Sequence, residues 1–256
     1  MLMSFTRTAR ATMLGLGLLV AAGRADAAMI LSVENAGVQS SQVAGVTTEN
    51  FNSYATGTYA VTNQASTVGN FTSPGIAVVG VDQFGGAGGS GNYFAIGIES
   101  GTTTATLTFS AAQSYFGFWW SAADAGNQIA LYSAGKLLGN FSAATTIAAL
   151  NSNYNGNPNG SFNGTTNPDQ KYAYLNFTGT NGTTIDKVVF TNASLNTGFE
   201  ADNFSIRAAA TGISGTVVNG GFVSAVPEPS SLAMVTIVGL AGAGGWLRAR
   251  RRGIPA

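Results

Sequence analysis

The stretch 103-TTATLTFSAAQSYFGFWW-120 carries the two clearest strand patterns of the chain. In its first part, threonines alternate with Ala105, Leu107 and Phe109, which is the period-two pattern of a strand with one buried face. Its second part, residues 115–120, is apolar on both faces, so we expect it to lie centrally between two sheets. Together the two patterns predict an all-β fold with residues 115–120 at its core.

The surrounding sequence has the same character. It is rich in threonine, serine and asparagine, it contains 35 glycines, and the helix formers Glu, Lys and Arg are scarce, so strands and turns are favoured. The spacing of the strand patterns predicts an antiparallel, jelly-roll-like β-sandwich over residues 28–210, with an immunoglobulin-type sandwich as the alternative. The further predicted strands are residues 29–33, 76–81, 93–98, 128–132, 136–141, 172–177, 185–191 and 203–208. Ser133-Ala134-Gly135 is predicted to form a short hairpin link between residues 128–132 and 136–141.

Segments of low complexity interrupt the strand patterns. The glycine-rich residues 85–91 are expected to form a mobile loop, because glycine has little conformational bias. Residues 151–170 predict a long loop, and residues 211–225 predict a linker that follows the sandwich. Only residues 143–150 show a weak helical period.

The N-terminus has the features of a secretion signal. Two arginines precede an apolar stretch over residues 11–22, and Ala25-Asp26-Ala27 has the small-x-small form of a signal-peptidase site. We therefore predict a signal peptide over residues 1–27, cleaved before Ala28. The alternative is an N-terminal transmembrane anchor, which the short apolar stretch disfavours.

The C-terminal residues combine a Pro-Glu-Pro motif, an uncharged apolar run and an arginine cluster, in that order. These are Pro227, Glu228 and Pro229; residues 231–247; and Arg248, Arg250, Arg251 and Arg252. The run is at the lower length limit for a transmembrane helix. By the positive-inside rule, the arginines would keep its far end in the cytoplasm, so the body of the protein is expected on the other side of the membrane.

This order of features resembles the PEP-CTERM sorting signal of Gram-negative bacteria, here residues 226–252. The resemblance implies recognition by exosortase, a membrane protease, with the Pro-Glu-Pro motif as the recognition element and the arginines as the retention charge. It also implies export across the inner membrane, anchoring by the C-terminal segment before processing, and association with extracellular polysaccharide and biofilm. An ordinary C-terminal membrane anchor is the alternative.

Charge and residue types exclude several kinds of function. Between Ala28 and Val226 there are four basic and nine acidic residues, a net charge of −5, which argues against nucleic acid as a partner. The chain has no cysteine and no histidine, so disulfides, Ser-His-Asp or Cys-His catalysis and the usual zinc sites are excluded. The glycine-rich loop also lacks the Lys-Ser/Thr ending of a phosphate-binding loop.

Residues 199–206, Phe-Glu-Ala-Asp-Asn-Phe-Ser-Ile, resemble the closing strand of jelly-roll domains in PEP-CTERM proteins and carbohydrate-binding modules. The resemblance implies that an acid at this place can help to hold a structural calcium. Glu200 and Asp202 are two residues apart and would share a face, and Glu49 is a candidate third ligand, since calcium takes six to eight oxygen ligands. The alternative is that Asp202 accepts backbone hydrogen bonds while Glu200 is solvated.

Aromatic side chains exposed on a sandwich can stack on the apolar faces of sugar rings, and the candidates are Trp119, Trp120 and Tyr132. Adjacent residues of a strand point to opposite faces, so at most one of the tryptophans can serve a given site. The alternative places both tryptophans in the core.

Paired carboxylates would suggest a glycan-active hydrolase. The acids near predicted strand ends are Glu99, Asp124, Glu200 and Asp202, and nothing in the sequence pairs them. The sequence therefore favours a non-catalytic, secreted surface or matrix protein. The alternatives are a carbohydrate-binding module and a glycan-active hydrolase.

Overall fold

A computed structural model of the chain describes residues 28–224. The predicted signal peptide (1–27) and the predicted sorting signal (226–252), with its apolar run at 231–247, lie outside these residues. Within residues 28–224, no helix combines the length and the apolar character needed to cross a membrane.

The described residues form a 13-stranded sheet in which all the recorded strand pairs are antiparallel, so the prediction of an antiparallel all-β fold is confirmed. The strands are β1 (Ala28–Val33), β2 (Thr47–Glu49), β3 (Gly57–Ser66), β4 (Gly69–Gly80), β5 (Asn92–Gly97), β6 (Thr104–Gln113), β7 (Tyr115–Ala123), β8 (Asn127–Ser133), β9 (Lys136–Ser142), β10 (Lys171–Thr180), β11 (Ile185–Asn192), β12 (Gly198–Arg207) and β13 (Thr216–Ser224). The helical segments are η1 (Ala87–Gly89), α1 (Ala143–Thr146) and η2 (Ser152–Tyr154).

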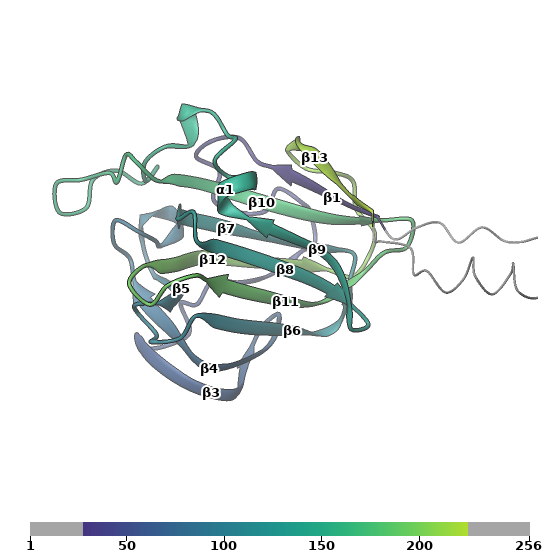
Figure 1. Ribbon diagram of the computed structural model, residues 1–256, viewed down its shortest axis with the longest axis horizontal. Coiled ribbons are helices and arrows are strands. Elements are labelled where there is room, and N and C mark those ends of the chain that lie inside the picture. Colours follow the sequence, from purple (N-terminus) through teal and green to yellow (C-terminus); the bar gives the residue numbers. More distant parts are fainter. Residues whose placement is uncertain (1–27, 225–256) are drawn as a thin grey trace, which may run out of the picture.

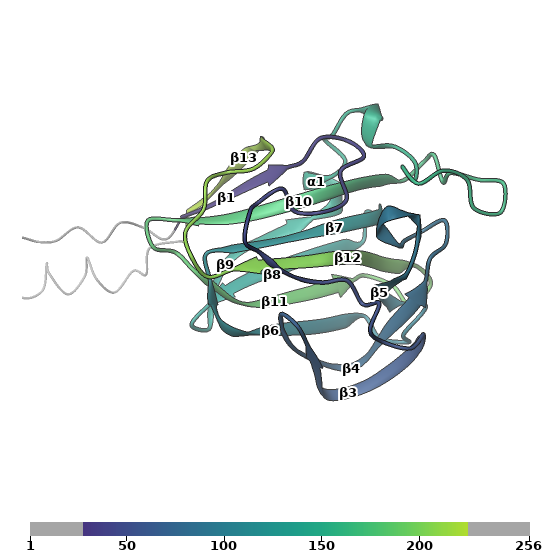
Figure 2. The ribbon, with the colours of Figure 1, turned by 180° about the vertical axis from the view of Figure 1, so that it is seen from behind.

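The sheet folds over on itself into two layers (Figures 1 and 2). Hydrogen bonds connect the strands in the order β13-β1-β10-β7-β12-β5-β4-β6-β11-β8-β9. Strand β4 belongs to both layers, because residues 69–72 pair with β6 and residues 77–80 pair with β5. We call the strands from β13 to β5 the first layer and those from β6 to β9 the second layer. The long strand β4 therefore turns the corner between them.

The core lies between the two layers, and β7 is central to it. β7 pairs with β10 on one side and with β12 on the other. Its side chains Phe116, Phe118 and Trp120 point into the main core cluster and are fully buried. In β6, Ala105 and Leu107 are buried in the same cluster, so the period-two prediction for this strand is confirmed.

The second face of β7 is covered by loops and not by a second sheet, which corrects the expectation that this strand lies between two sheets. Figure 2 shows the segment that follows β1 crossing over β10, β7 and β12. Its Ser41 hydroxyl lies 2.8 Å from the hydroxyl of Tyr115 in β7, and its Gln39 carbonyl accepts a hydrogen bond from Asn203 in β12 (2.8 Å). A strand that is apolar on both faces thus needs other parts of the chain to pack on both, but on one face these can be loops instead of a second sheet.

The structure tests two predicted connections, the hairpin link between β8 and β9 and the linker over residues 211–225. The hairpin between β8 and β9 is confirmed, and its turn residues Ala134 and Gly135 both have positive φ (47° and 79°), as a two-residue hairpin turn requires. The linker expected over residues 211–225 is wrong for residues 216–224, because these form β13 and pair with β1. Strand β3, which pairs with β4, was also not predicted.

Substitution of Gly69, where β4 begins, tests how closely β4 approaches β6. A Cβ atom here would collide with the Thr108 carbonyl oxygen and lie 2.9 Å from Phe109 Cα, both backbone atoms of β6, and its φ is 156°. Gly69→Ala is therefore expected to destabilise the domain by about 1–3 kcal/mol more than Gly101→Ala, because overpacking against backbone has no easy relaxation. Gly101 is the matched control, since its φ is also positive (72°) but nothing lies within 4 Å of its Cβ position. Equal losses in urea unfolding would contradict the close approach of β4 and β6.

Candidate functional site

Neither Trp119 nor Trp120 is exposed, so the expectation that one of them forms a platform for sugar stacking is wrong. Trp120 is fully buried between Phe118 and Phe199, with ring centroids 5.5 Å and 5.1 Å away. Trp119 is 1% exposed and points to the opposite face, where it packs against Tyr172 at 5.8 Å. The prediction that the two side chains separate to opposite faces is confirmed, and both are packing residues.

Tyr132 does not lie in the same layer as Trp119 and Trp120. It lies on β8 in the second layer, is half-buried, and has the Lys187 ammonium 4.2 Å from its ring centroid. The three aromatic residues proposed from the sequence therefore do not form one site.

The glycine-rich loop that follows β4 closes over Trp119. Phe84 and Ala87 of this loop pack on the small cluster formed by Trp119, Ala122, Tyr172 and Tyr174. The Tyr172 hydroxyl donates a hydrogen bond to the Gln83 carbonyl (2.6 Å), and the Asn159 amide donates to the Gly86 carbonyl (3.1 Å).

Close packing explains at least one glycine of this loop better than mobility does. A Cβ atom on Gly85 would lie 2.6 Å from the ring of Tyr93. The expectation of a mobile loop at residues 85–91 is therefore replaced by a packed one. It is held by Tyr172 of β10 and by Gln39 and Asn159 of two other loops, with Gln39 Oε1 accepting a hydrogen bond from the Gly88 N–H (2.8 Å).

Glu49 is a structural carboxylate. It lies at the end of β2 and is 2% exposed. Its Oε1 accepts a hydrogen bond from the Phe51 N–H (2.9 Å), and its Oε2 accepts from the N–H and the hydroxyl of Thr67 (2.9 and 3.1 Å). Its Oε2 thus ties β2 to the turn between β3 and β4, and its Oε1 holds the backbone that follows β2.

Asp202 also accepts backbone hydrogen bonds, as the alternative interpretation of the sequence had it. Its Oδ2 accepts from the Ala87 N–H (2.8 Å) of the glycine-rich loop, and its Oδ1 accepts from the Asn203 N–H (2.6 Å). Asn203 has φ 51° and sits where the register between β12 and β7 shifts, so the carboxylate stabilises a β-bulge. Burial raises the pKa of Asp202 to about 7, although the two backbone donors lower it.

Glu200 differs from both alternatives drawn from the sequence. It shares the outer face of β12 with Asp202, because Phe199 and Ala201 point into the core, but it is only 4% exposed and is not solvated. Among residues 28–224, no group of three or more acidic side chains is arranged to hold one metal ion. The structure thus does not unite Glu49, Glu200 and Asp202 as a calcium ligand set.

Glu200 lies instead beside Glu99. A Cβ atom on Gly198 would collide with Glu200 Oε1 and lie 3.1 Å from Glu99 Oε2. The two carboxylate oxygens therefore lie within about 5 Å of each other, close enough for like charges to disfavour ionisation of both. We call Glu99 and Glu200 the carboxylate pair.

Two more acids surround the carboxylate pair. Burial raises the pKa of Glu200 well above its usual value, and the charges of Glu99, Asp124 and Asp82 raise it further. Burial is also the largest cause of the raised pKa of Glu99, with Asp82 and Asp124 adding to it. We call these four residues the acidic cluster.

The segments that supply the acidic cluster are far apart in the sequence. Asp82 follows β4, Glu99 follows β5, Asp124 follows β7, and Glu200 lies in β12. Gly198 of β12 pairs with Gly97 of β5, and this register sets the distance between the pair. Sequence analysis named three of the four acids near strand ends but had no signal that paired them, because the contact depends on the register of remote strands.

Comparison with known proteins adds no relative. No protein-family model matches the chain, and no curated protein matches it. The chemistry of the site therefore rests on its own residues, which are titratable carboxyl groups on a domain whose large aromatic side chains are mostly buried.

Proposed function

We propose that this protein is a secreted, non-catalytic component of the bacterial cell surface or extracellular matrix, sorted by exosortase in an exopolysaccharide setting. The observation that carries the proposal is the order of features in the tail: Pro227-Glu228-Pro229, the apolar run at 231–247 and the arginines from Arg248 to Arg252. The tail would hold the protein in the inner membrane until exosortase processes it, and extracellular polysaccharide would then be its surroundings.

The arrangement of the domain supports this proposal. Ala28, the residue that follows the proposed signal-peptidase site, lies in β1, and Ser224, shortly before the Pro-Glu-Pro motif, lies in β13. Ala28 pairs directly with Ser224, so the two ends of the domain lie side by side at one edge of the first layer. Removal of a leader and of a tail at these places would leave the sandwich intact.

The alternation of the strands between layers supports membership of the jelly-roll class. Strands β5, β7, β10 and β12 lie in the first layer, whereas β6, β8, β9 and β11 lie in the second, so successive strands mostly cross between layers. Such crossings are typical of Greek-key and jelly-roll sandwiches. The function proposed here needs only a stable, charge-poor domain, and it assigns no catalytic role to any residue.

The test is the intact mass and cellular location of the full-length chain, produced in hosts with and without an exosortase system. We expect a mass that lacks the leader and the residues beyond the Pro-Glu-Pro region, found outside the cell only when the system is present. Pro227→Ala combined with Pro229→Ala should leave the protein unprocessed and membrane-bound. Pro158→Ala, an exposed proline of the domain, is the matched control and should be processed normally.

A mass that keeps the arginine cluster, found in the membrane of both hosts, would contradict the proposal. The tail would then be a plain anchor, and the link to exopolysaccharide would be lost with it. Normal processing of the double proline variant would also contradict the proposal, because the Pro-Glu-Pro motif would then not be the element that exosortase recognises.

A further inference from the structure

The register of the strands places Ala28 and Ser224, the first and last described residues, at one end of the sandwich. Ala28 pairs with Thr180 of β10 and with Ser224 of β13. Thr178 of β10 pairs in turn with Tyr115, where β7 begins. We call the end of the sandwich at which these residues lie the terminal end.

The second layer reaches the same end. The single residue Ser114 joins β6 to β7, and Gln113 of β6 pairs with Ile185, where β11 begins. Strand β8 runs antiparallel to β11, so its turn into β9, at Ala134 and Gly135, lies beside the start of β11. The β6–β7 turn, the start of β11 and the β8–β9 turn therefore belong to the terminal end.

Three of the four basic residues of the domain lie at the terminal end. Lys136 begins β9, Lys187 is the third residue of β11, and Arg207 is the last residue of β12. The one acid beside them within residues 28–224 is Asp186, which accepts a hydrogen bond from the Ala134 N–H. Three positive charges and one negative charge give this end a net charge of +2. The one basic and eight acidic residues in the rest of the domain give a net charge of −7.

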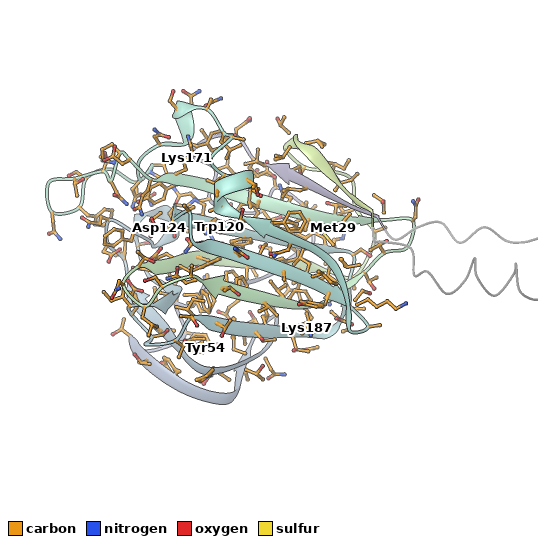
Figure 3. All side chains as sticks on the ribbon, in the orientation of Figure 1. Met29, Tyr54, Trp120, Asp124, Lys171 and Lys187 are labelled. Atoms are coloured by element: carbon orange, nitrogen blue, oxygen red, sulfur yellow. The ribbon has the colours of Figure 1, made fainter. Side chains whose placement is uncertain are left out.

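The acidic cluster lies at the opposite end of the sandwich. Figure 3 shows Met29 and Lys187 toward one end and Asp124 toward the other. Asp124 directly follows β7, which begins at the terminal end and runs away from it. The fourth basic residue, Lys171, pairs with Ala123 and so lies at the acidic end as well. The charge of the domain is therefore strongly asymmetric along the direction of its strands.

The side chains at the terminal end are open to a partner. The Arg207 guanidinium has five N–H donors and donates to the Ala44 carbonyl (2.7 Å), and no carboxylate of residues 28–224 forms an ion pair with it. Together with Gln113 it lines an open hollow of about 490 Å³. Lys136 is exposed, and its neighbour Leu137 is 51% exposed. Basic groups beside an exposed apolar side chain suit a phospholipid surface, which presents anionic phosphates above an apolar interior.

The short chain between the domain and the apolar run of the tail limits how far the terminal end can lie from the membrane. Seven residue steps separate Ser224 from Ser231, where the apolar run begins, and they span at most about 25 Å. An anionic surface attracts basic groups over about 8 Å at physiological salt. The connection is therefore long enough to let the terminal end touch the surface and short enough to keep it close.

We propose that the terminal end of the sandwich contacts an anionic phospholipid surface while the protein is anchored, with Lys136, Lys187 and Arg207 toward the lipid phosphates. This contact rests on the proposed function, because the tail brings this end of the domain to the membrane. The surface attracts the terminal end and repels the acidic end, so the charge asymmetry orients the domain. Each basic group close to the surface strengthens binding about fivefold, and salt screens this attraction.

The experiment measures how close each end of the domain lies to the lipid headgroups. The chain has no cysteine, so one exposed alanine at each end can be replaced to carry a fluorophore: Ala209→Cys at the terminal end and Ala125→Cys at the acidic end. The full-length chain is reconstituted in vesicles of phosphatidylcholine, alone or mixed equally with phosphatidylglycerol, that contain a quencher on the headgroup. We expect phosphatidylglycerol to raise the quenching at Ala209 severalfold relative to that at Ala125, and high salt to remove the rise.

Charge variants test which groups make the contact. Lys136→Gln, Lys187→Gln and Arg207→Gln in combination should remove the response to phosphatidylglycerol. Lys171→Gln is the matched control, because it removes a positive charge from the acidic end and should respond as the parent does. A circular dichroism melt checks that each variant is folded, and the salt dependence of the parent tests the contact without any charge variant.

Flotation of the same vesicles reports the tail anchor separately from the contact. If the chain floats with both kinds of vesicle and the quenching does not depend on phosphatidylglycerol, the contact is wrong and the anchor stands. If the parent floats only with phosphatidylglycerol and the triple variant does not float, the contact is supported and the tail is not an anchor. A chain that floats with neither contradicts both. Retention on an alginate gel without any response to lipid charge would overturn the contact and assign the terminal end to an acidic polysaccharide.

Discussion

Replacing Trp120 by alanine is expected to destabilise the domain by about 3–5 kcal/mol, a large part of the stability of a typical domain. Trp120 is fully buried in the main core, stacked on Phe199 with an interplanar angle of 22° and tilted against Phe118. Its removal would leave a cavity between Phe118 and Phe199. Urea unfolding followed by circular dichroism measures the loss.

Trp120→Phe is the matched variant for this prediction. The indole Nε1 of Trp120 is buried without a hydrogen-bond partner among the described residues, so phenylalanine gives up no hydrogen bond there. The expected cost is smaller than that of Trp120→Ala, because phenylalanine keeps one aromatic ring in the core and leaves a smaller cavity. If Trp120→Ala were as stable as the parent and instead lost retention on a polysaccharide gel, Trp120 would be a sugar-binding residue and its packing role would be wrong.

The second large effect is a rise in stability as the pH falls from 8 to 5, measured in the presence of a chelator. Asp202, Glu99 and Glu200 all have pKa values raised in the folded protein, chiefly by burial. The folded state therefore binds more protons than the unfolded state. The stabilisation that each of these groups contributes by protonation is complete below its pKa in the unfolded state, and it is lost as the pH rises through its pKa in the folded state. For Asp202 this window runs from 3.8 to about 7.

The size of the pH effect follows from the pKa change. At about 1.4 kcal/mol per pKa unit, Asp202 alone should contribute on the order of 2 kcal/mol between pH 8 and pH 5. Glu200→Gln removes one of the titrating groups and should flatten the profile and raise stability at pH 8, whereas the exposed Asp169→Asn should leave the profile unchanged. A stability that increased from pH 5 to pH 8 would contradict the raised pKa values.

Local patterns were sufficient to predict the strands whose apolar side chains follow a clear pattern along the sequence. Threonine alternating with apolar residues placed β6, and the apolar run placed β7 as the central strand of the core. The turn at Ala134 and Gly135 was equally readable, because a two-residue hairpin turn needs only local backbone geometry. The residues missed in β3, β13 and the first half of β4 lack such a pattern, and their extended conformation depends on pairing with a neighbour.

The site residues were less predictable than the strands. The sequence placed Glu200 and Asp202 on one face of β12, which holds, but it joined them to Glu49, which ties β2 to a hairpin turn instead. Glu99 became the neighbour of Glu200 because β5 and β12 pair in a particular register across about a hundred residues of chain. A period of two in the sequence states which face a residue occupies, but it does not state what lies against that face.

The features of this protein that follow from local sequence patterns therefore differ from those that depend on contacts between remote segments. Composition and periodicity were enough to establish an antiparallel all-β domain and, through the lack of histidine and cysteine, to exclude whole classes of catalysis and metal binding. Which tryptophan enters the core, what covers the other, and which carboxylates meet were settled by long-range packing. Burial of an outward face needs loops from remote parts of the chain, here residues 34–46 and 81–91, and no local pattern encodes where such loops come to lie.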